Sequence, residues 1–250
     1  MIEEISPGSL YSASVGVKMA AEQEIDIAVR ERFFHEKREG VLIEVGAARP
    51  DYLSIGASYR ERGWTVIAIE PNPDFCDMHR ALGHEVLQYA CSDQDKDGVD
   101  FYVVASKDAE YLGGRVSFES FSSLGIKGGF AEDLQKTRSD REIKTIKVNV
   151  RKLDTILQEH YPGITAIDLL AIDVEGWELD VMRGLSTKKY RPRIVILENL
   201  FRSRSYRTFM KRNGYTLWKR LKPNEVYIRS DIRLGFLEML HSRMTTLFSF

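Results

Sequence analysis

Two acidic residues in the first third of the chain have the types and the spacing of a nucleoside-binding site. Glu44 lies in the apolar run Val41–Val45, and Gly46 follows it, where a missing side chain lets a ligand approach the backbone closely. Glu70 follows a second apolar run, residues 65–69, and comes 26 residues after Glu44. A carboxylate at such a strand end accepts hydrogen bonds from both hydroxyls of a ribose. The alternative for Glu70 is a strand-end carboxylate in solvent.

The turn after the first run is poor in glycine, which limits the kind of nucleotide it can hold. It reads Gly46-Ala-Ala-Arg-Pro50, without the G-x-G-x-x-G pattern of a dinucleotide site, and the chain has no phosphate-binding loop motif. A nucleoside that carries an amino-acid tail instead of phosphates fits better, and S-adenosylmethionine is such a molecule. We expect Glu44 to face its sulfonium, Gly46 its methionine part and Glu70 its ribose. The remaining residues expected to contact it are Ala47, Ala48, Pro71, Asn72, Ser92 and Asp93 (at the adenine edge), and Asp173.

Short apolar runs alternate with helical patterns along most of the chain, which predicts an α/β fold with a doubly wound sheet. Strands are expected at 41–45, 65–69, 85–89, 100–105, 143–150, 169–173 and 193–197, with a final hairpin at 215–221 and 225–229. Helices are expected at 20–34, 52–62, 74–82, 152–160, 176–183 and 203–213. The prediction is a sheet of about seven strands, parallel until an antiparallel C-terminal hairpin, with helices on both faces.

Three segments flank or interrupt this core. Residues 1–39 are expected to form a helical lead-in, and residues 40–230 the main domain. Within it, the irregular stretch 106–142 is predicted to be a lid or acceptor-binding loop, since long loops in compact domains are usually functional. Residues 231–250 have apolar side chains at helical spacing and predict an amphipathic C-terminal helix.

Composition indicates a globular, soluble, cytoplasmic protein. Of the 250 residues, 43% are hydrophobic and 29% charged, which excludes a disordered chain. Cys76 and Cys91 are too few for a disulfide framework or a cysteine zinc site. The acidic N-terminus does not resemble a secretory signal, and no run of apolar residues is long enough to span a bilayer.

Charge is distributed unevenly along the chain. Residues 1–182 contain 20 Lys and Arg against 33 Asp and Glu, whereas residues 183–250 contain 16 against 4. The basic C-terminal quarter is either a surface for an anionic partner or a solvated rim. Tyr206, Trp218 and Tyr227 lie among these basic residues and would either stack bases or pack in the core. The terminal helix would pack on a partner subunit in a homo-oligomer, cover the sheet, or lie on a membrane.

Several of these segments together resemble the FkbM family of S-adenosylmethionine-dependent methyltransferases. The resemblance covers roughly residues 40–228 and is carried by Leu42–Ala48, Gly63-Trp64, Ile67–Pro73, Phe121–Leu124, Leu153-Asp154, Leu170–Glu178, Gly184-Leu185, Val195–Asn199 and Gly214-Tyr215. It implies a Rossmann-like class I methyltransferase fold, with S-adenosylmethionine as cofactor. Many members have an asparagine and a second glycine where this chain has Ala48 and Pro50, so the details of cofactor contact are open.

The resemblance further implies methyl transfer to oxygen, on a sugar, glycan or small metabolite. Asp173, Glu175 and Glu198 are the candidate catalytic residues, and Asp173 or Glu198 would orient or deprotonate the acceptor. Asp173 has an alternative role, which is to hold the methionine amine of the cofactor. Residues expected to contact the acceptor are Ser122, Ser123 and Asn199. The three acids have the types of a metal site, but we expect no metal.

Two other functions remain open. One is an RNA methyltransferase that uses the basic C-terminal face, for which a steep salt dependence of RNA affinity is expected. The other is a non-catalytic relative that keeps the fold, because a fold alone does not establish a function.

Overall fold

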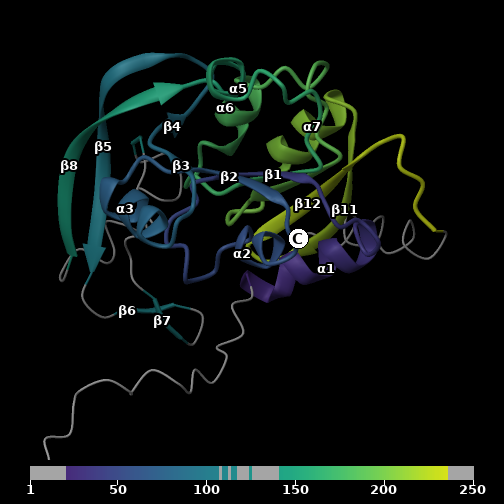
Figure 1. Ribbon diagram of the computed structural model, residues 1–250, viewed down its shortest axis with the longest axis horizontal. Coiled ribbons are helices and arrows are strands. Elements are labelled where there is room, and N and C mark those ends of the chain that lie inside the picture. The colour runs from purple at the N-terminus through teal and green to yellow at the C-terminus, as the bar shows by residue number, and fades with distance from the viewer. Residues whose placement is uncertain (1–20, 107–108, 112–113, 117–123, 126–140, 236–250) are drawn as a thin grey trace, which may run out of the picture.

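The computed structural model describes residues 21–106, 109–111, 114–116, 124–125 and 141–235 (Figure 1). Its centre is a seven-stranded sheet in the order β11-β12-β10-β9-β1-β2-β3. The strands of this sheet are β1 (Val41–Val45), β2 (Thr65–Ile69), β3 (Val86–Leu87), β9 (Leu169–Ile172), β10 (Ile194–Glu198), β11 (Tyr215–Leu221) and β12 (Asn224–Arg229). All neighbours pair in parallel except β12, which is antiparallel to β10 and β11. The predicted sheet with its antiparallel hairpin is therefore confirmed.

The strand order reverses at β1, and this reversal determines where a ligand can enter. From β1 the chain proceeds outward to β2 and β3 on one side, and later to β9 and β10 on the other. Val45 aligns with Ile69 in β2 and with Ile172 in β9, so the three strands end at one level. In open α/β sheets, ligands bind outside the carboxyl ends of the strands at such a reversal.

Helices cover both faces of the sheet, as Figure 1 shows. The helices are η1 (Glu22–Glu24), α1 (Ile25–Phe33), α2 (Ala57–Arg60), α3 (Pro73–Ala81), α5 (Leu153–His160), α6 (Glu178–Arg183) and α7 (Arg204–Arg212). One buried cluster joins Ile43 and Val45 of β1 to α5, α6 and α7. A second cluster joins Leu42 of β1 to α1 and α2 on the opposite face. Side chains alternate between faces along a strand, so β1 contributes to both layers.

A second sheet departs from the expected arrangement. Its strands are β4 (Ala90–Cys91), β5 (Lys96–Ser106) and β8 (Arg141–Arg151), in the order β4-β8-β5. The predicted strands at 100–105 and 143–150 are therefore not parallel members of the main sheet, because they pair antiparallel with each other in β5 and β8. Alternation of apolar and polar residues indicates that a strand has one buried face, but it does not indicate which strand lies beside it. A short hairpin joins β6 (Ala109–Tyr111) to β7 (Gly114–Val116).

The predicted helix at 52–62 is much shorter than expected. Only Ala57–Arg60 forms α2, and Leu53 has a φ of +55°. The cause is the buried carboxylate of Glu44, which accepts hydrogen bonds from Ser54 Oγ and from the backbone N–H of Gly56. These contacts fix the chain before α2 in a loop conformation. The other predicted helices are found close to their expected ranges.

The two ends of the chain lie mostly outside the described residues. The lead-in contains η1 and α1, and α1 packs through an edge-to-face contact of Phe33 with Trp218, with ring centroids 4.8 Å apart. The C-terminal helix is predicted for residues 231–250, of which 231–235 form a turn and irregular chain and 236–250 lie outside the described residues. Tyr206, Trp218 and Tyr227 are all buried, so none of these rings is presented for base stacking. Across the described ranges, no helix is long and apolar enough to cross a bilayer.

Candidate functional site

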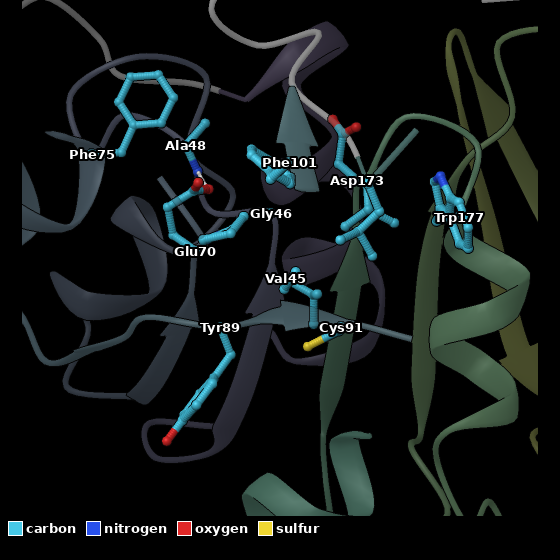
Figure 2. Close-up of a pocket in the computed structure, with 14 residues that line it drawn as sticks. Val45, Gly46, Ala48, Glu70, Phe75, Tyr89, Cys91, Phe101, Asp173 and Trp177 are labelled. Carbon is cyan, nitrogen blue, oxygen red and sulfur yellow. Dashed lines mark hydrogen bonds between the residues drawn. The ribbon is translucent and has the colours of Figure 1, made fainter. Parts of the chain in front are cut away.

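A cleft opens at the carboxyl ends of β1, β2 and β9, where the strand order reverses (Figure 2). Its empty volume, including the open mouth, is about 520 Å³, within the range of small-molecule sites. The lining residues are Val45, Gly46, Ala48, Glu70, Pro71, Phe75, Tyr89, Ala90, Cys91, Phe101, Leu124, Asp173, Val174 and Trp177. Four of the predicted cofactor residues from the β1 and β2 ends, together with Asp173, thus lie around one cleft.

Gly46 lies where the ends of β1 and β9 come closest. Its φ is +75°, and a Cβ atom built there would lie 1.8 Å from the backbone oxygen of Asp173. The backbone N–H of Asp173 donates to Val45 O at 3.0 Å, which holds the two strand ends together. Only glycine satisfies both the positive φ and the close approach. The wall of the cleft at this point is therefore bare backbone.

Glu70 is the predicted ribose carboxylate, and it lies in the wall of the cleft facing the β1 turn. Its Oε2 accepts from the N–H of Ala48 at 2.9 Å, and its Oε1 accepts from the N–H of Asn72 at 2.8 Å. Burial raises its pKa to about 7, while these two hydrogen bonds act in the opposite direction. A carboxylate has about four acceptor positions. Each oxygen of Glu70 therefore retains one position for a ligand hydroxyl.

Residues around Glu70 are fixed by helix α3. The side chain of Asn72 caps α3 by accepting from the N–H of Asp74 at 3.1 Å, and Pro73 occupies the first helical turn. Proline and a capping amide are both favoured at this end of a helix. Asn72 is buried and does not line the cleft, whereas Pro71 does.

His79 supports the turn from behind, a role that no pattern in the sequence indicates. Its Nε2 lies 3.1 Å from the backbone oxygen of Ala48, the residue whose N–H is bound by Glu70. Burial lowers the pKa of His79 to about 4, and the nearby charge of Arg60 adds to this effect. The ring is thus neutral near pH 7, and it donates from Nε2. The backbone of Ala48 is therefore held at its N–H by Glu70 and at its oxygen by His79.

Glu44 is not brought to the cleft. It lies on the face of β1 that carries Leu42, and its carboxylate bonds to Ser54 and to the N–H of Gly56. Burial raises its pKa, and the charge of Arg60 partly opposes this. Ala47 is also buried, and its N–H donates to Ile69 O at 3.2 Å.

The predicted adenine residues lie at the margin of the cleft. Ala90 and Cys91 line it, whereas Ser92 and Asp93, which follow them, do not. The Ser92 hydroxyl donates to Asp93 at 3.3 Å, and Ser92 is buried against Gly184. Phe75, Tyr89 and Phe101, which the sequence did not indicate as site residues, supply the aromatic part of the lining together with Trp177.

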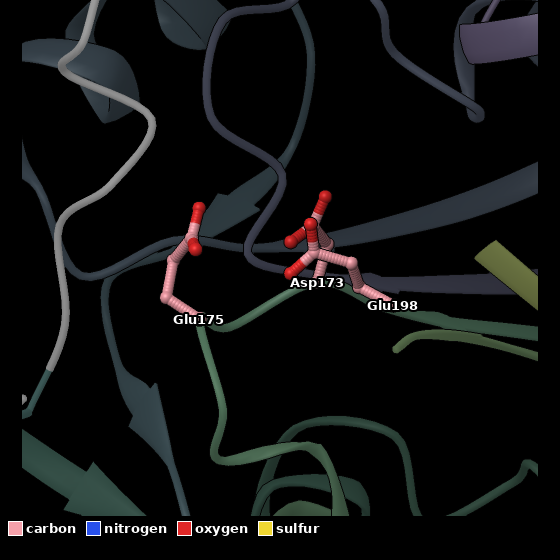
Figure 3. Close-up of side chains that lie close together, drawn as sticks. All are labelled: Asp173, Glu175 and Glu198. Atoms are coloured by element: carbon pink, nitrogen blue, oxygen red, sulfur yellow. The ribbon is translucent and has the colours of Figure 1, made fainter. Parts of the chain in front are cut away.

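Three predicted catalytic acids are brought together at the ends of β9 and β10. One carboxylate oxygen from each of Asp173, Glu175 and Glu198 lies within 4.8 Å of the others, and Figure 3 shows the three side chains together. Asp173 is exposed to the cleft, while Glu175 and Glu198 are buried. Desolvation, followed by the charges of neighbouring carboxylates, raises the pKa of all three groups.

Glu178 holds the loop that carries two of these acids. Its Oε1 accepts from the N–H groups of Val174 and Gly176, and its Oε2 accepts from the hydroxyl of Tyr206. The adjoining Trp177 lines the cleft and donates from Nε1 to the backbone oxygen of Gly125 at 3.0 Å. The loop after β9 is thus tied to helix α6 and to the segment that contains Gly125.

Two of the predicted acceptor residues lie outside the described part of the chain, and the third is engaged elsewhere. Ser122 and Ser123 are not among the described residues. Asn199 donates to Ser203 O at 3.2 Å and to Glu225 at 3.1 Å, and it accepts from the N–H of Ser203 at 2.8 Å. Its amide therefore anchors the start of α7 to β12. Of the predicted lid or acceptor loop, Leu124 lines the cleft.

Comparisons with known proteins find methyltransferases. The sequence model described as the methyltransferase FkbM domain matches residues 44–217, well over half of the chain. The protein named methyltransferase sdnD, from Sordaria araneosa, is 36% identical over 73 residues, which are 26% of this chain and 28% of that protein. A crystal structure of a methyltransferase FkbM from Methylobacillus flagellatus KT aligns with a TM-score of 0.47 and 13% identity, over 78% of this chain and 46% of that one. The chain thus spans less than half the length of both proteins.

Proposed function

Since the chain belongs to the FkbM methyltransferase family, we propose that it is an S-adenosylmethionine-dependent methyltransferase that acts on a hydroxyl of a sugar, glycan or small metabolite. The observation that supports the cofactor most directly is Glu70. It is a buried carboxylate at the end of β2, with one acceptor position left on each oxygen and the cleft beside it. A ribose presents two neighbouring hydroxyls that match these two positions.

The residues around the cleft fit the other parts of S-adenosylmethionine. Position 46 has to be glycine, because a side chain there would meet Asp173. The bare backbone that results lines the cleft and lets the methionine part approach closely. Apolar and aromatic side chains at Phe75, Tyr89 and Cys91 suit an adenine. Asp173 is exposed at the mouth, where its carboxylate would meet either the methionine amine or the acceptor.

The side chains of this protein would bind S-adenosylmethionine, orient the acceptor and accept the acceptor's proton. When bound, S-adenosylmethionine supplies a methyl group on a sulfonium sulfur, which keeps the bonding electrons and leaves as a neutral thioether once the acceptor oxygen takes the methyl carbon. The acceptor oxygen also loses its proton, and the grouping of Asp173, Glu175 and Glu198 supports a role for one of these carboxylates in orienting that hydroxyl or taking the proton. Positioning supplies most of the remaining rate enhancement.

The cofactor proposal is tested by calorimetric titration with S-adenosylmethionine and S-adenosylhomocysteine. Wild-type protein is expected to bind both, and Glu70→Ala is expected to lose most of the affinity. Glu159→Gln is the matched control, since Glu159 is an exposed acid on α5. Absence of binding in the wild type, or equal binding in Glu70→Ala, would overturn the assignment and favour a non-catalytic relative of the fold.

The role of Asp173 is tested separately with Asp173→Asn. We expect this variant to keep its affinity for S-adenosylhomocysteine and to lose turnover, which is the result for a group that acts on the acceptor. Lost cofactor affinity would instead assign Asp173 to the methionine amine. Transfer of an isotope-labelled methyl group, followed by NMR of the product, distinguishes an O-methyl from an N-methyl product.

A further inference from the structure

The three acids at the ends of β9 and β10 form a compact set of oxygen ligands. Asp173 follows β9, Glu175 lies in the loop two residues on, and Glu198 is the last residue of β10. One oxygen from each lies within 4.8 Å of the others (Figure 3). Two neighbouring strands and one loop, all tied to the core, therefore direct carboxylates to one point.

The protein pairs its other buried acids in this region with hydrogen-bond donors. Glu178 receives two backbone N–H groups and the Tyr206 hydroxyl, and Glu225 receives Arg220 and the Tyr227 hydroxyl. Glu175 is also buried, with 7% of its surface exposed. It differs from these acids because its Oε2 has no hydrogen-bond partner among the described residues. An unpaired buried carboxylate oxygen costs free energy, and Asp26 Oδ2 is the other such oxygen among the described residues.

Three carboxylates thus meet at this point, and one of them has a buried oxygen without a donor among the described residues. A bound cation would supply the positive partner that buried charges require.

We propose that Asp173, Glu175 and Glu198 bind a hard divalent cation of the Mg²⁺, Mn²⁺ and Ca²⁺ class. Carboxylate oxygens are the preferred ligands of these ions. Two oxygens on opposite sides of one ion are about 4.2 Å apart for Mg²⁺ and about 4.6 to 5.2 Å apart for Ca²⁺, and the set spans no more than 4.8 Å. This differs from the expectation drawn from the sequence, which recognised the three acids as possible ligands but predicted no metal.

The ion would extend the proposed function by selecting the acceptor, and this role rests on that function. An ion held beside the exposed Asp173 faces the cleft and keeps open coordination positions for an acceptor oxygen. Coordination lowers the pKa of a bound hydroxyl, and its proton would pass to the second oxygen of the Asp173 carboxylate, because each residue offers only one oxygen to the ion. The acceptor class that uses two open positions is a molecule with neighbouring oxygens, such as the vicinal diol of a sugar.

Cation binding is tested without any turnover, by titrating the full chain with Mn²⁺ and following the loss of the free-ion EPR signal. Mg²⁺ and Ca²⁺ are then used as competitors. We expect Glu175→Gln and Glu198→Gln to weaken Mn²⁺ binding by about 10-fold or more, and Glu159→Gln to leave it unchanged. Asp173→Asn is a third variant, chosen because its exposed side chain is the least needed for folding. Thermal unfolding supplies a second readout, in which Mn²⁺ raises the Tm of the wild type more than NaCl of equal ionic strength does.

The outcomes separate this proposal from the proposed function. Failure of the wild type to bind any of the three cations at up to about 10 mM overturns the cation site, as does equal binding by all the variants. If S-adenosylhomocysteine still binds in that case, the methyltransferase assignment stands and only the cation site is lost. If the cation binds but the nucleoside does not, the cation site stands and the methyltransferase assignment fails.

Discussion

Gly46→Ala is the substitution that examines the geometry of the cleft most directly. A Cβ atom at this position would lie 1.8 Å from the backbone oxygen of Asp173, and contacts shorter than 3.0 Å are not tolerated. The end of β9 would have to move by about 1.2 Å, which is the difference between these two distances. Such a shift strains the hydrogen bond from Asp173 N–H to Val45 O and opens the strand pair at the base of the cleft.

The magnitude follows from comparison with Gly83→Ala. Gly83 has a φ of +73°, against +75° for Gly46, and a Cβ atom there meets nothing within 4 Å. Both variants share the cost of a left-handed alanine, about 1 to 2 kcal/mol, reduced by about 0.4 to 1 kcal/mol through the unfolded chain. Only Gly46→Ala adds the displacement of β9, which costs about 1 to 3 kcal/mol in a packed core and about 1 to 3 kcal/mol for a buried hydrogen bond.

We therefore expect Gly46→Ala to lower the free energy of unfolding by about 3 kcal/mol more than Gly83→Ala does. Urea denaturation measures both values, and the Tm should fall by about 6 to 12 °C more for Gly46→Ala. Calorimetry should show loss of S-adenosylhomocysteine binding in Gly46→Ala alone. If the two variants are equally stable and bind equally well, the strand ends do not meet at Gly46, and the reasoning about the cleft is refuted.

Three further predictions concern titratable groups near the cleft. The pKa of Glu70 rises from about 4.5 when unfolded to about 7 when folded, so its stabilising contribution is complete below pH 4.5 and is lost as pH rises through 7. Glu70→Gln should remove this pH-dependent loss of unfolding free energy, about 3 kcal/mol, in denaturation measured from pH 4.5 to 8. The affinity of the wild type for S-adenosylhomocysteine should increase from pH 6 to 8, because the ionised carboxylate accepts both ribose hydroxyls. The pKa of His79 is lowered to about 4, so its contribution is complete above pH 6.5 and is lost as pH falls to 4. His79→Gln, which keeps a donor for Ala48, should abolish that acid-dependent loss of about 2 to 3 kcal/mol, and an unchanged acid profile would contradict the assignment. Burial raises the pKa of the Cys76 thiol to about 12 and that of Cys91 further still, so a thiol reagent at pH 8 should modify neither until the protein is unfolded.

Local sequence determined the main elements and part of the site. The apolar runs at 41–45, 65–69, 169–173 and 193–197 became β1, β2, β9 and β10 within a residue of their expected bounds. Most residues of these runs are buried, and continuous apolar runs of this length between helical segments are typical of parallel strands. Because parallel strands end at one edge of a sheet, the order of elements already placed Gly46, Glu70 and Asp173 near one another.

Other features depend on contacts between distant segments, which no local pattern encodes. The sequence placed Glu44 at the sulfonium, but β1 turns its carboxylate to the opposite face, where Ser54 and Gly56 bind it. The support of Ala48 by His79 crosses 31 residues, and nothing in the pattern around His79 indicates it. Asn199 fits the motif at the end of β10, yet it is used to anchor α7.

The sequence by itself determined most of the longer strands and helices, and that acids follow the central strands, because hydrophobic period and strand-end chemistry are local properties. Only the tertiary structure decided that β5 and β8 leave the main sheet, and that Asp173, Glu175 and Glu198 meet within 4.8 Å. Strand partners and the convergence of side chains depend on how the whole chain packs. A one-residue change of register or face redirects every side chain of a strand, and the sequence pattern is compatible with more than one such arrangement.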